Sequence, residues 1–594
     1  MLDIAAGTDM STSSPTAPAL RRVGPVAVAA VIYAALAVFG LWHAWSTDPN
    51  AYALSGGGDQ AASMWFLTWA PYALIHGHNP MFSTYANFPY GLNMMVNTST
   101  LPLGLVAVPV TLLFGQTTSF NLLETLAFIT SALAAYALVR RFTTWHPAAF
   151  VGGLLYGFSP YMVAQGVGHL NLLFVPLPPL IFMVLHDIVV RQPGRPQVRG
   201  VVLGLLIVVQ FFISSEVLLG TMAMAVAALI VIALFGSREV RAHLRYATTA
   251  LCSAALLTLV LLCYPAWFLF YGSAHIVGPI QTAPQVYKAD LLGPLLPDSL
   301  QHFAPATFAN TADRFAGNGS ENGSYLGLPL VIALVVSVVA LWRTKAVRIA
   351  GILCAFAFLI SLGSRLAVSN HSTGVPLPEG VFDKLPVLKN VLPVRFSLYV
   401  ALCGAVILGV ALERVHRARP WRGLAGSLAV PGILAVAVLV PLVPAWPYPM
   451  QPTGVPAYFT SKAVDAIAPG SVVLVYPFPD ANFANPENWQ ASAFLRFKMP
   501  GGRFNVPEPL TGASSASRSS LTDTVLGELA AGTPPERTPA LRARLDSELR
   551  SWHVRSVVAI PAGVDFPQAR AFLTWMLGRP PTNSAGALTW YDWS

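Results

Sequence analysis

The chain has 594 residues, of which 55% are hydrophobic and only 10% are charged. Soluble domains carry about one quarter charged residues, so the composition excludes an ordinary soluble protein and indicates a polytopic membrane protein. The net charge of +9 comes from short basic clusters between apolar segments, a pattern that orients membrane helices. We therefore expect the lipid bilayer as a partner and no nucleic acid. The four cysteines all lie in apolar segments without metal-ligand spacing, so no metal or other cofactor is expected.

The N-terminal segment, residues 1–22, is rich in Ser, Thr, Ala and Pro and is predicted to be disordered and cytoplasmic. Arg21 and Arg22 precede the first apolar run, which is too long for a signal peptide and lacks a cleavage site. We interpret this run as a membrane anchor with its N-terminus inside.

Apolar runs between the basic clusters predict about eleven transmembrane helices and a plasma-membrane protein. The expected spans are 24–46, 119–139, 148–165, 172–190, 200–220, 221–236, 247–271, 325–342, 349–363, 396–413 and 424–446. Residues 101–115 are apolar but too short for a crossing, and we interpret them as a re-entrant or interfacial helix.

This topology predicts a transmembrane domain over residues 23–446, with three long loops outside the cell. The expected loops are 46–100, 272–324 and 364–394. A polar C-terminal domain, 447–594, follows outside the membrane; its apolar runs 472–477 and 554–561 read as short buried strands ended by proline. With an amphipathic helix over 540–550, this domain is predicted to be α/β. The fold class is therefore mainly α with an extracytoplasmic α/β domain.

The first external loop places an acid, Asp59, after three glycines and directly before an aromatic stretch, 64–75. Charge close to lipid is costly and tends to be kept for function. Asp59 is a candidate catalytic base; the alternative is a helix cap. Asp48, the other acid of this loop, is explained by the turn Ser46-Thr47-Asp48-Pro49.

Side chains that suit a sugar follow in the same loop. Trp65 belongs to the aromatic stretch, which alternatively forms an interfacial helix. Neutral hydrogen-bonding groups and rings recur beyond it, and the candidate substrate-binding residues of this loop are Gln60, Trp65, His78, Tyr90 and Asn93.

Further candidates lie at the outer ends of later segments. His169 could bond a phosphate or a sugar hydroxyl, or be a satisfied surface histidine. Glu216 is an ionisable group near a span end, where a structural hydrogen bond is the alternative. His302 and Glu321 stand out in the second long loop, and Glu321 could equally start a helix.

Two cations lie on the outer side, where positive charge is sparse. Lys389 and Arg395 flank the turn Asn390-Val391-Leu392-Pro393-Val394, and Arg395 stands at the mouth of a helix. Arginine binds phosphate oxygens with a two-pronged fork, so both residues are candidates for a lipid phosphate. The alternative for Arg395 is an ion pair or a headgroup anchor.

Together these features resemble the GT-C superfamily of membrane glycosyltransferases, in particular actinobacterial and YfhO-like members. The similarity covers nearly the whole chain and rests on the acid after the first helix, Gly157-Phe158-Ser159-Pro160, and Leu392-Pro393-Val394-Arg395. Many relatives carry a second acid beside the first, where this chain has Gln60.

The resemblance implies an inverting transfer of a sugar from a polyprenyl-monophosphate donor to an envelope glycan or glycolipid at the outer face. Asp59 would be the general base, and Arg395, Lys389 and His169 would bind the donor phosphate. Mannose or arabinofuranose would be the natural sugar for an actinobacterial cell envelope. A monophosphate donor needs no divalent metal. Two alternatives remain: a transporter of lipid-linked saccharides, and a non-catalytic assembly protein whose tail (488–490 and 500–504) binds glycan.

Overall fold

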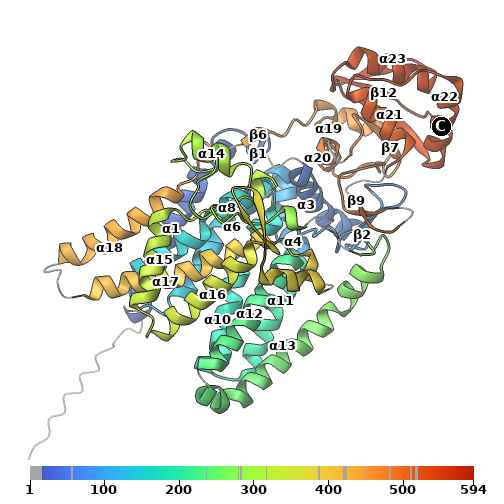
Figure 1. The fold of residues 1–594 in the computed structure, drawn as a ribbon. Helices are drawn as coiled ribbons and strands as arrows, with labels where there is room; N and C mark the ends of the chain where they lie inside the picture. The colour runs from blue at the N-terminus through green and yellow to red at the C-terminus, as the bar shows by residue number, and fades with distance from the viewer. Residues whose placement is uncertain are drawn as a thin grey trace, which may run out of the picture.

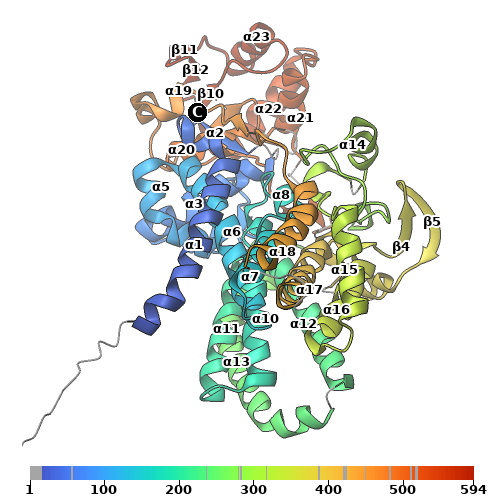
Figure 2. The ribbon, with the colours of Figure 1, turned by 90° about the vertical axis from the view of Figure 1, so that its left-hand side faces the viewer.

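A computed structural model describes residues 17–593, except 55–57, 236, 279, 281–283, 316, 386–387, 419–423, 449, 481–482, 509–510 and 516–518. The predicted disordered segment therefore lies largely outside the described residues, as does the glycine turn before Gly58. The described chain forms a bundle of long helices with the C-terminal region packed at one end (Figures 1 and 2).

The prediction of a mainly helical, multi-span membrane protein is confirmed. Within the described residues, six helical segments are long and apolar enough to cross a membrane: 116–139, 170–191, 196–213, 215–235, 244–271 and 393–417. Three shorter apolar helices, 24–40, 328–340 and 428–442, accompany them.

The helices overlap the apolar runs that predict them, with two larger differences: the expected span 148–165 is interrupted after Gly157, and the helix expected over 247–271 begins already at Ser237. The bundle contains α1 (Ala17–Gly40), α6 (Gln116–Val139), α7 (His146–Gly157), α10 (Leu177–His186), α11 (Pro196–Ile213), α12 (Ser215–Phe235), α13 (Ser237–Tyr271), α15 (Leu328–Ala340), α16 (Lys345–Ser361), α17 (Ser397–Arg417) and α18 (Leu424–Leu439). The expected span 200–220 is divided at Ser214, whose extended backbone ends α11 before α12 begins.

Residues 101–115 form two short helices, α4 (Leu101–Val106) and α5 (Val108–Phe114). Each helix has a proline in its first turn, where the missing N–H costs no helical hydrogen bond. Neither helix has the length of a span. The segment thus lacks a single continuous crossing helix, as its short apolar run predicts.

The three long loops and the C-terminal region meet at one end of the bundle. Strand β1 (Tyr52–Leu54) pairs antiparallel with β6 (Met450–Pro452). In the second loop, Gln301 bridges to Pro444. The third loop joins the second where the Leu291 N–H donates to the Ala367 carbonyl, 3.0 Å away. Segments far apart in sequence therefore build one common end of the molecule.

The C-terminal region contains a four-stranded mixed sheet in the order β11-β12-β10-β7. The predicted strands are confirmed: β7 (Val472–Tyr476) and β10 (Val554–Ala559) form its parallel pair. Strands β12 (Ala587–Trp590) and β11 (Thr582–Ser584) extend the sheet antiparallel.

Both faces of strand β7 are covered, which is why its sequence is apolar throughout. Leu474 packs with α21 (Leu521–Ala530), α22 (Pro539–Ser551) and α23 (Phe566–Leu577). On the other face, Val473 and Val475 pack with Trp489 of α20 (Asn485–Ser492). The predicted helix over 540–550 corresponds to α22.

The aromatic stretch forms α3 (Gly58–His76), but it is not an exposed interfacial helix. Trp65 and Trp69 are buried, and the Trp65 indole donates to Gln490 Oε1 of α20 at 2.6 Å. Phe504 packs edge-on against Trp65. The first loop and the C-terminal region therefore share a core, which fixes α3 and the acid at its start.

Candidate functional site

Asp59 lies in the first turn of α3, and its carboxylate is directed at other segments of the chain. Oδ2 is 2.9 Å from His169 Nε2, and Oδ1 is 3.6 Å from the guanidinium of Arg503. The side chain is 45% exposed, so a ligand can reach it. The helix-cap alternative would direct the carboxylate at its own helix, whereas here it contacts His169 and Arg503 from distant parts of the chain.

A hydrogen-bonded relay leads from Asp59 into the protein. His169 Nδ1 is 2.9 Å from Gln165 Oε1 on α8 (Pro160–Gln165), and Gln165 Nε2 donates to Glu321 Oε2 at 3.0 Å. Because the Gln165 amide gives its N–H to Glu321, its oxygen must accept from His169 Nδ1. An ionised Asp59 can only accept, so Oδ2 is the acceptor in its contact with His169 Nε2.

Arg395 stands at the inner end of this relay, paired with two carboxylates. Its Nε donates to Glu321 Oε2 at 3.1 Å, and its terminal nitrogens contact Glu321 and Glu216. Glu216 also accepts from the Leu392 N–H at 2.7 Å. The Arg395 side chain is only 13% exposed. The ion-pair alternative for Arg395 is thus what the structure contains, and a phosphate would have to displace a glutamate to reach it.

Arg503, the second partner of Asp59, comes from the C-terminal region. The Arg503 main-chain N–H donates to Glu487, a fully buried residue of α20. The Arg503 side chain then passes over Gly58, where a Cβ atom would be 2.0 Å from Arg503 Cδ. Gly58, the residue before Asp59, therefore allows the Arg503 side chain to approach closely.

The electrostatics of the site favour an ionised Asp59. Burial acts to raise the pKa of Asp59, but the hydrogen bond and charge of His169, followed by the charges of Arg503 and Arg395, outweigh it and lower the pKa below its usual value. Burial is also the largest influence on Glu321, yet Arg395 lowers the Glu321 pKa. By contrast, burial raises the pKa of Glu487 well above the usual range.

The structure brings together five of the predicted site residues, Asp59, His169, Glu216, Glu321 and Arg395, through contacts with one another and with Gln165. Gln60 follows Asp59 in α3 and is half-buried. Lys389 lies in a short 3-10 turn three residues before Leu392, whose N–H binds Glu216.

The other predicted residues have different surroundings. Trp65 and Asn93 are buried, and the Asn93 amide donates to the Phe268 and Ser273 carbonyls. His78 is exposed and stacks with the rings of the buried residues Trp69 and Tyr72 of α3. Tyr90 is 45% exposed, and His302 packs edge-on against Phe303 on an exposed loop. Their roles in substrate binding stay predictions.

Sequence reasoning missed Gln165 and the role of Arg503. Arg503 was part of a tail segment considered as a glycan surface, and only its flanking glycines hinted at close packing. The accompanying residues 488–490 are buried, so they present no such surface. Within the described residues, no group of three or more His, Cys, Asp or Glu could hold a metal ion.

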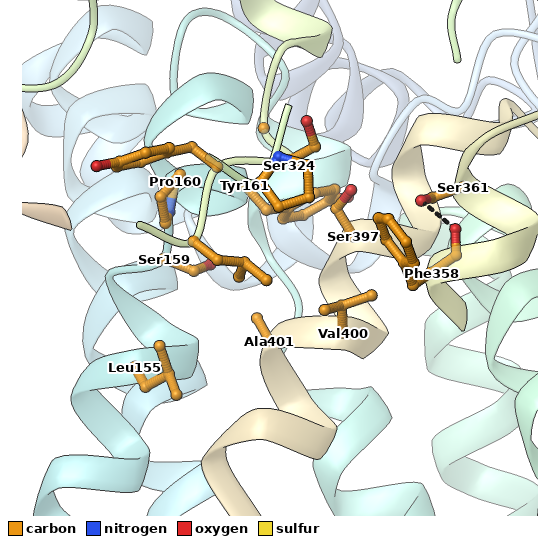
Figure 3. A pocket seen from close by; sticks show the side chains of 14 residues that line it. Leu155, Ser159, Pro160, Tyr161, Ser324, Phe358, Ser361, Ser397, Val400 and Ala401 are labelled. Carbon is orange, nitrogen blue, oxygen red and sulfur yellow. Dashed lines mark hydrogen bonds between the residues drawn. The ribbon is translucent and has the colours of Figure 1, made fainter. Parts of the chain in front are cut away.

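A small cavity lies behind the site, next to Tyr161 and Gly323 (Figure 3). Hydroxyl groups of Ser159, Ser324 and Ser397 line it, and its volume is about 10 Å³. A volume of about 10–15 Å³ accommodates one water molecule. This cavity is therefore too small for a sugar or a lipid.

Comparison with known proteins places the chain in a family. The family model described as "Domain of unknown function (DUF6311)" matches residues 27–390, which includes Asp59, His169, Glu216 and Glu321. The chain belongs to this family. Arg395 and Arg503 lie beyond the matched residues. No curated protein matches the sequence.

Solved membrane proteins share a similar arrangement of elements at low identity. The oligosaccharyltransferase AglB from Archaeoglobus fulgidus, in complex with an inhibitory peptide and a dolichol-phosphate, is 12% identical, with 93% of this chain and 71% of that chain covered and a TM-score of 0.43. The arabinofuranosyltransferase AftD from Mycobacteria is 13% identical, with 96% and 41% covered and a TM-score of 0.49.

ArnT from Cupriavidus metallidurans, bound to undecaprenyl phosphate, is 11% identical, with 96% and 98% covered and a TM-score of 0.44. The chain thus spans less than half of the arabinofuranosyltransferase and nearly all of ArnT. Similarity of fold does not carry activity, so the chemistry of this protein has to be argued from its own residues.

Proposed function

We propose that the protein is a membrane glycosyltransferase that moves a sugar from a polyprenyl-monophosphate lipid to a hydroxyl of a glycan or glycolipid. The observation that carries the proposal is the reachable Asp59 carboxylate held between His169 and Arg503. One anionic base beside two cationic groups suits a reaction in which a hydroxyl loses a proton and a phosphate leaves. The resemblance of the sequence to GT-C glycosyltransferases supports the same reaction class.

In the proposed step, the acceptor oxygen attacks the anomeric carbon of the sugar while its proton passes to Asp59. The bond between that carbon and the phosphate oxygen breaks, and the electron pair leaves with the lipid phosphate. A direct displacement of this kind inverts the anomeric centre. General-base catalysis of this type contributes about 10²–10⁴-fold to the rate.

Arg503 and His169 are the groups we assign to the leaving phosphate. Both flank Asp59, whereas the donors of Arg395 already serve Glu216 and Glu321. Cations fixed in advance beside developing phosphate charge stabilise the transition state. An arriving phosphate would also raise the pKa of Asp59 through like charge, which makes it a stronger base at the moment it is needed.

Arg395 takes a positioning role in this proposal. Through Glu321 and Gln165 it fixes His169, and through Glu216 it fixes the turn at Leu392. The expected specificity for mannose or arabinofuranose would be set by side chains other than those that contact Asp59 and Arg395.

The test is transfer of a labelled sugar from a polyprenyl-phosphate donor by the purified protein in lipid nanodiscs, with Asp59→Asn compared against Asp48→Asn. Asp48 lies in the same loop and is exposed, and its carboxylate accepts the Asn50 N–H. We expect Asp59→Asn to lower the rate at least 100-fold and Asp48→Asn to leave it unchanged.

Full activity of a folded Asp59→Asn variant would refute the assignment of the base. A wild-type protein that moves the intact donor across vesicle membranes, without transferring its sugar, would instead identify a transporter.

A further inference from the structure

Arg503 belongs to a short segment, residues 501–505, that lies between the first loop and α20. The Gly501 carbonyl accepts the N–H of Asn87 in the first loop at 2.8 Å. The Phe504 ring is buried against α3. The backbone of this segment is therefore fixed on both sides of Arg503, and its course decides where the arginine side chain begins.

Glu487 of α20 holds this segment at Arg503 itself. The Glu487 side chain is fully buried, and its Oε1 accepts the Arg503 main-chain N–H. A Cβ atom on Gly502 would lie 3.5 Å from the same oxygen, so the carboxyl group faces the backbone of the turn. The second oxygen, Oε2, is also buried and has no hydrogen-bond partner among the described residues. One oxygen of Glu487 thus binds Arg503, and the other binds no described group.

The surroundings of Glu487 favour a neutral carboxyl group. Burial raises the pKa of Glu487 well above its usual value and the charge of Asp59 adds to the rise, against the opposing effect of the Arg503 N–H and charge. Burying an ionised carboxylate is costly unless its oxygens are hydrogen-bonded, and Oε2 is not. A neutral group with its hydrogen on Oε2 leaves Oε1 able to accept the Arg503 N–H. The interaction with Arg503 therefore needs an acceptor oxygen and no negative charge.

Asn97 of the first loop holds the same segment two residues further along. Its Oδ1 accepts the Asn505 N–H at 2.7 Å, and its Nδ2 donates to the Asn505 carbonyl at 2.9 Å. The Asn97 amide also donates to the Asn93 carbonyl at 3.0 Å. One side chain thus binds both backbone polar groups of residue 505, while Glu487 binds the N–H of residue 503.

We propose that Glu487, as a neutral carboxyl group, is a positioning residue that holds Arg503 beside Asp59 for binding of the donor's lipid phosphate. This role rests on the proposed function, which assigns Arg503 to that phosphate. The Arg503 side chain is long and 35% exposed, and its guanidinium stands 3.6 Å from the Asp59 carboxylate. Fixing the main chain at its root limits the orientations that the guanidinium can adopt, and a cation fixed in advance stabilises developing phosphate charge more strongly.

The experiment measures the KM for the polyprenyl-phosphate donor and for the acceptor with the purified full chain in lipid nanodiscs. Glu487→Met removes the acceptor oxygen at similar volume and leaves the Arg503 N–H without this partner. It should raise the KM for the donor about tenfold and leave the KM for the acceptor unchanged. Glu528→Met is the matched control, because Glu528 is an exposed glutamate of α21 in the same region, and it should change neither KM.

Two further variants separate a positioning role from a general loss of stability. Glu487→Gln keeps an acceptor oxygen and carries no charge, so it should recover most of the affinity for the donor that Glu487→Met loses. In a chain that already carries Arg503→Gln, Glu487→Met should add no further increase in the KM for the donor, because effects that act through one group are not additive.

Hydrogen exchange measured by mass spectrometry follows the segment itself and needs no transferase activity. Glu487→Met should speed exchange at the amides of residues 501–505 about tenfold over the wild type, whereas Glu487→Gln should not. If Glu487→Met does not fold, Asn97→Leu provides the same test at the Asn505 amide. A wild-type protein that is inactive as a transferase yet shows this exchange pattern would refute the proposed function and leave the placement of Arg503 by Glu487 standing.

Three results would overturn the proposal. The first is equal exchange over residues 501–505 in Glu487→Met and the wild type. The second is a rise in the KM for the donor that is as large in the Arg503→Gln chain as in the wild type, which would show that Glu487 does not act through Arg503. The third is a Glu487→Gln variant as impaired as Glu487→Met, which would show that an ionised carboxylate is required.

Discussion

Arg395 offers the sharpest test of the charge cluster, because one guanidinium neutralises two carboxylates. Side-chain exposure is 13% for Arg395, 3% for Glu321 and 21% for Glu216. Removing one partner from a buried ion pair costs about 3–5 kcal/mol, since the remaining charge stays buried. Glu321 bears most of this cost, while Glu216 keeps the Leu392 N–H and some water. We expect Arg395→Met to lower the free energy of unfolding by about 3–5 kcal/mol.

The measurement is unfolding in mixed micelles with increasing denaturing detergent, followed by circular dichroism. Arg414→Met on the same helix is the control; Arg414 is exposed, and surface changes usually stay within about 0.5 kcal/mol. Adding Glu216→Gln and Glu321→Gln to Arg395→Met removes the uncompensated charges and should recover more than half of the loss.

A loss below about 1 kcal/mol for Arg395→Met, similar to that of the control, would refute the idea that the cluster is charged and buried. A full loss with no recovery in the triple variant would show that packing, rather than charge, sets the stability there.

Two further predictions concern the surroundings of Asp59. Gly58→Ala places a Cβ atom 2.0 Å from Arg503 Cδ and should raise the KM for the lipid donor about tenfold, whereas Gly527→Ala, with nothing within 4 Å, should not. His169→Gln removes the hydrogen bond and charge that lower the pKa of Asp59, so that pKa should rise and the acid limb of the kcat/KM pH profile should move to higher pH. Folding lowers the pKa of Asp59, so the ionised carboxylate stabilises the protein at pH values above the pKa of Asp59 in the unfolded chain. This stabilisation is lost as the pH falls through the pKa of Asp59 in the folded protein. The loss of stability on acidification should be smaller in His169→Gln. An unchanged KM in Gly58→Ala would contradict the first prediction. An unchanged acid limb in His169→Gln would contradict the second.

The helical framework and the strands of the C-terminal region could be predicted from the amino-acid sequence. Apolar runs set the helix positions because a membrane span needs about twenty apolar residues. Strands β7 and β10 were predictable because buried parallel strands are apolar on both faces. The sequence also marked Asp59, since a carboxylate near lipid is rare without a function.

The pairing of the charged side chains could not be predicted from the sequence, because it depends on how distant segments pack. Asp59 and Arg503 are separated by most of the chain, and no local pattern predicts that a C-terminal arginine crosses Gly58 to reach the acid. In the same way, a glutamate from each of two segments neutralises Arg395, although in the sequence it stands as an isolated cation. Helix and strand formation depend on periodicities within a segment, whereas ion pairs depend on how segments pack. Packing brings the first loop and the C-terminal region together around Trp65, and this contact places Arg503 beside Asp59. His169 reaches the acid from the segment that follows α8.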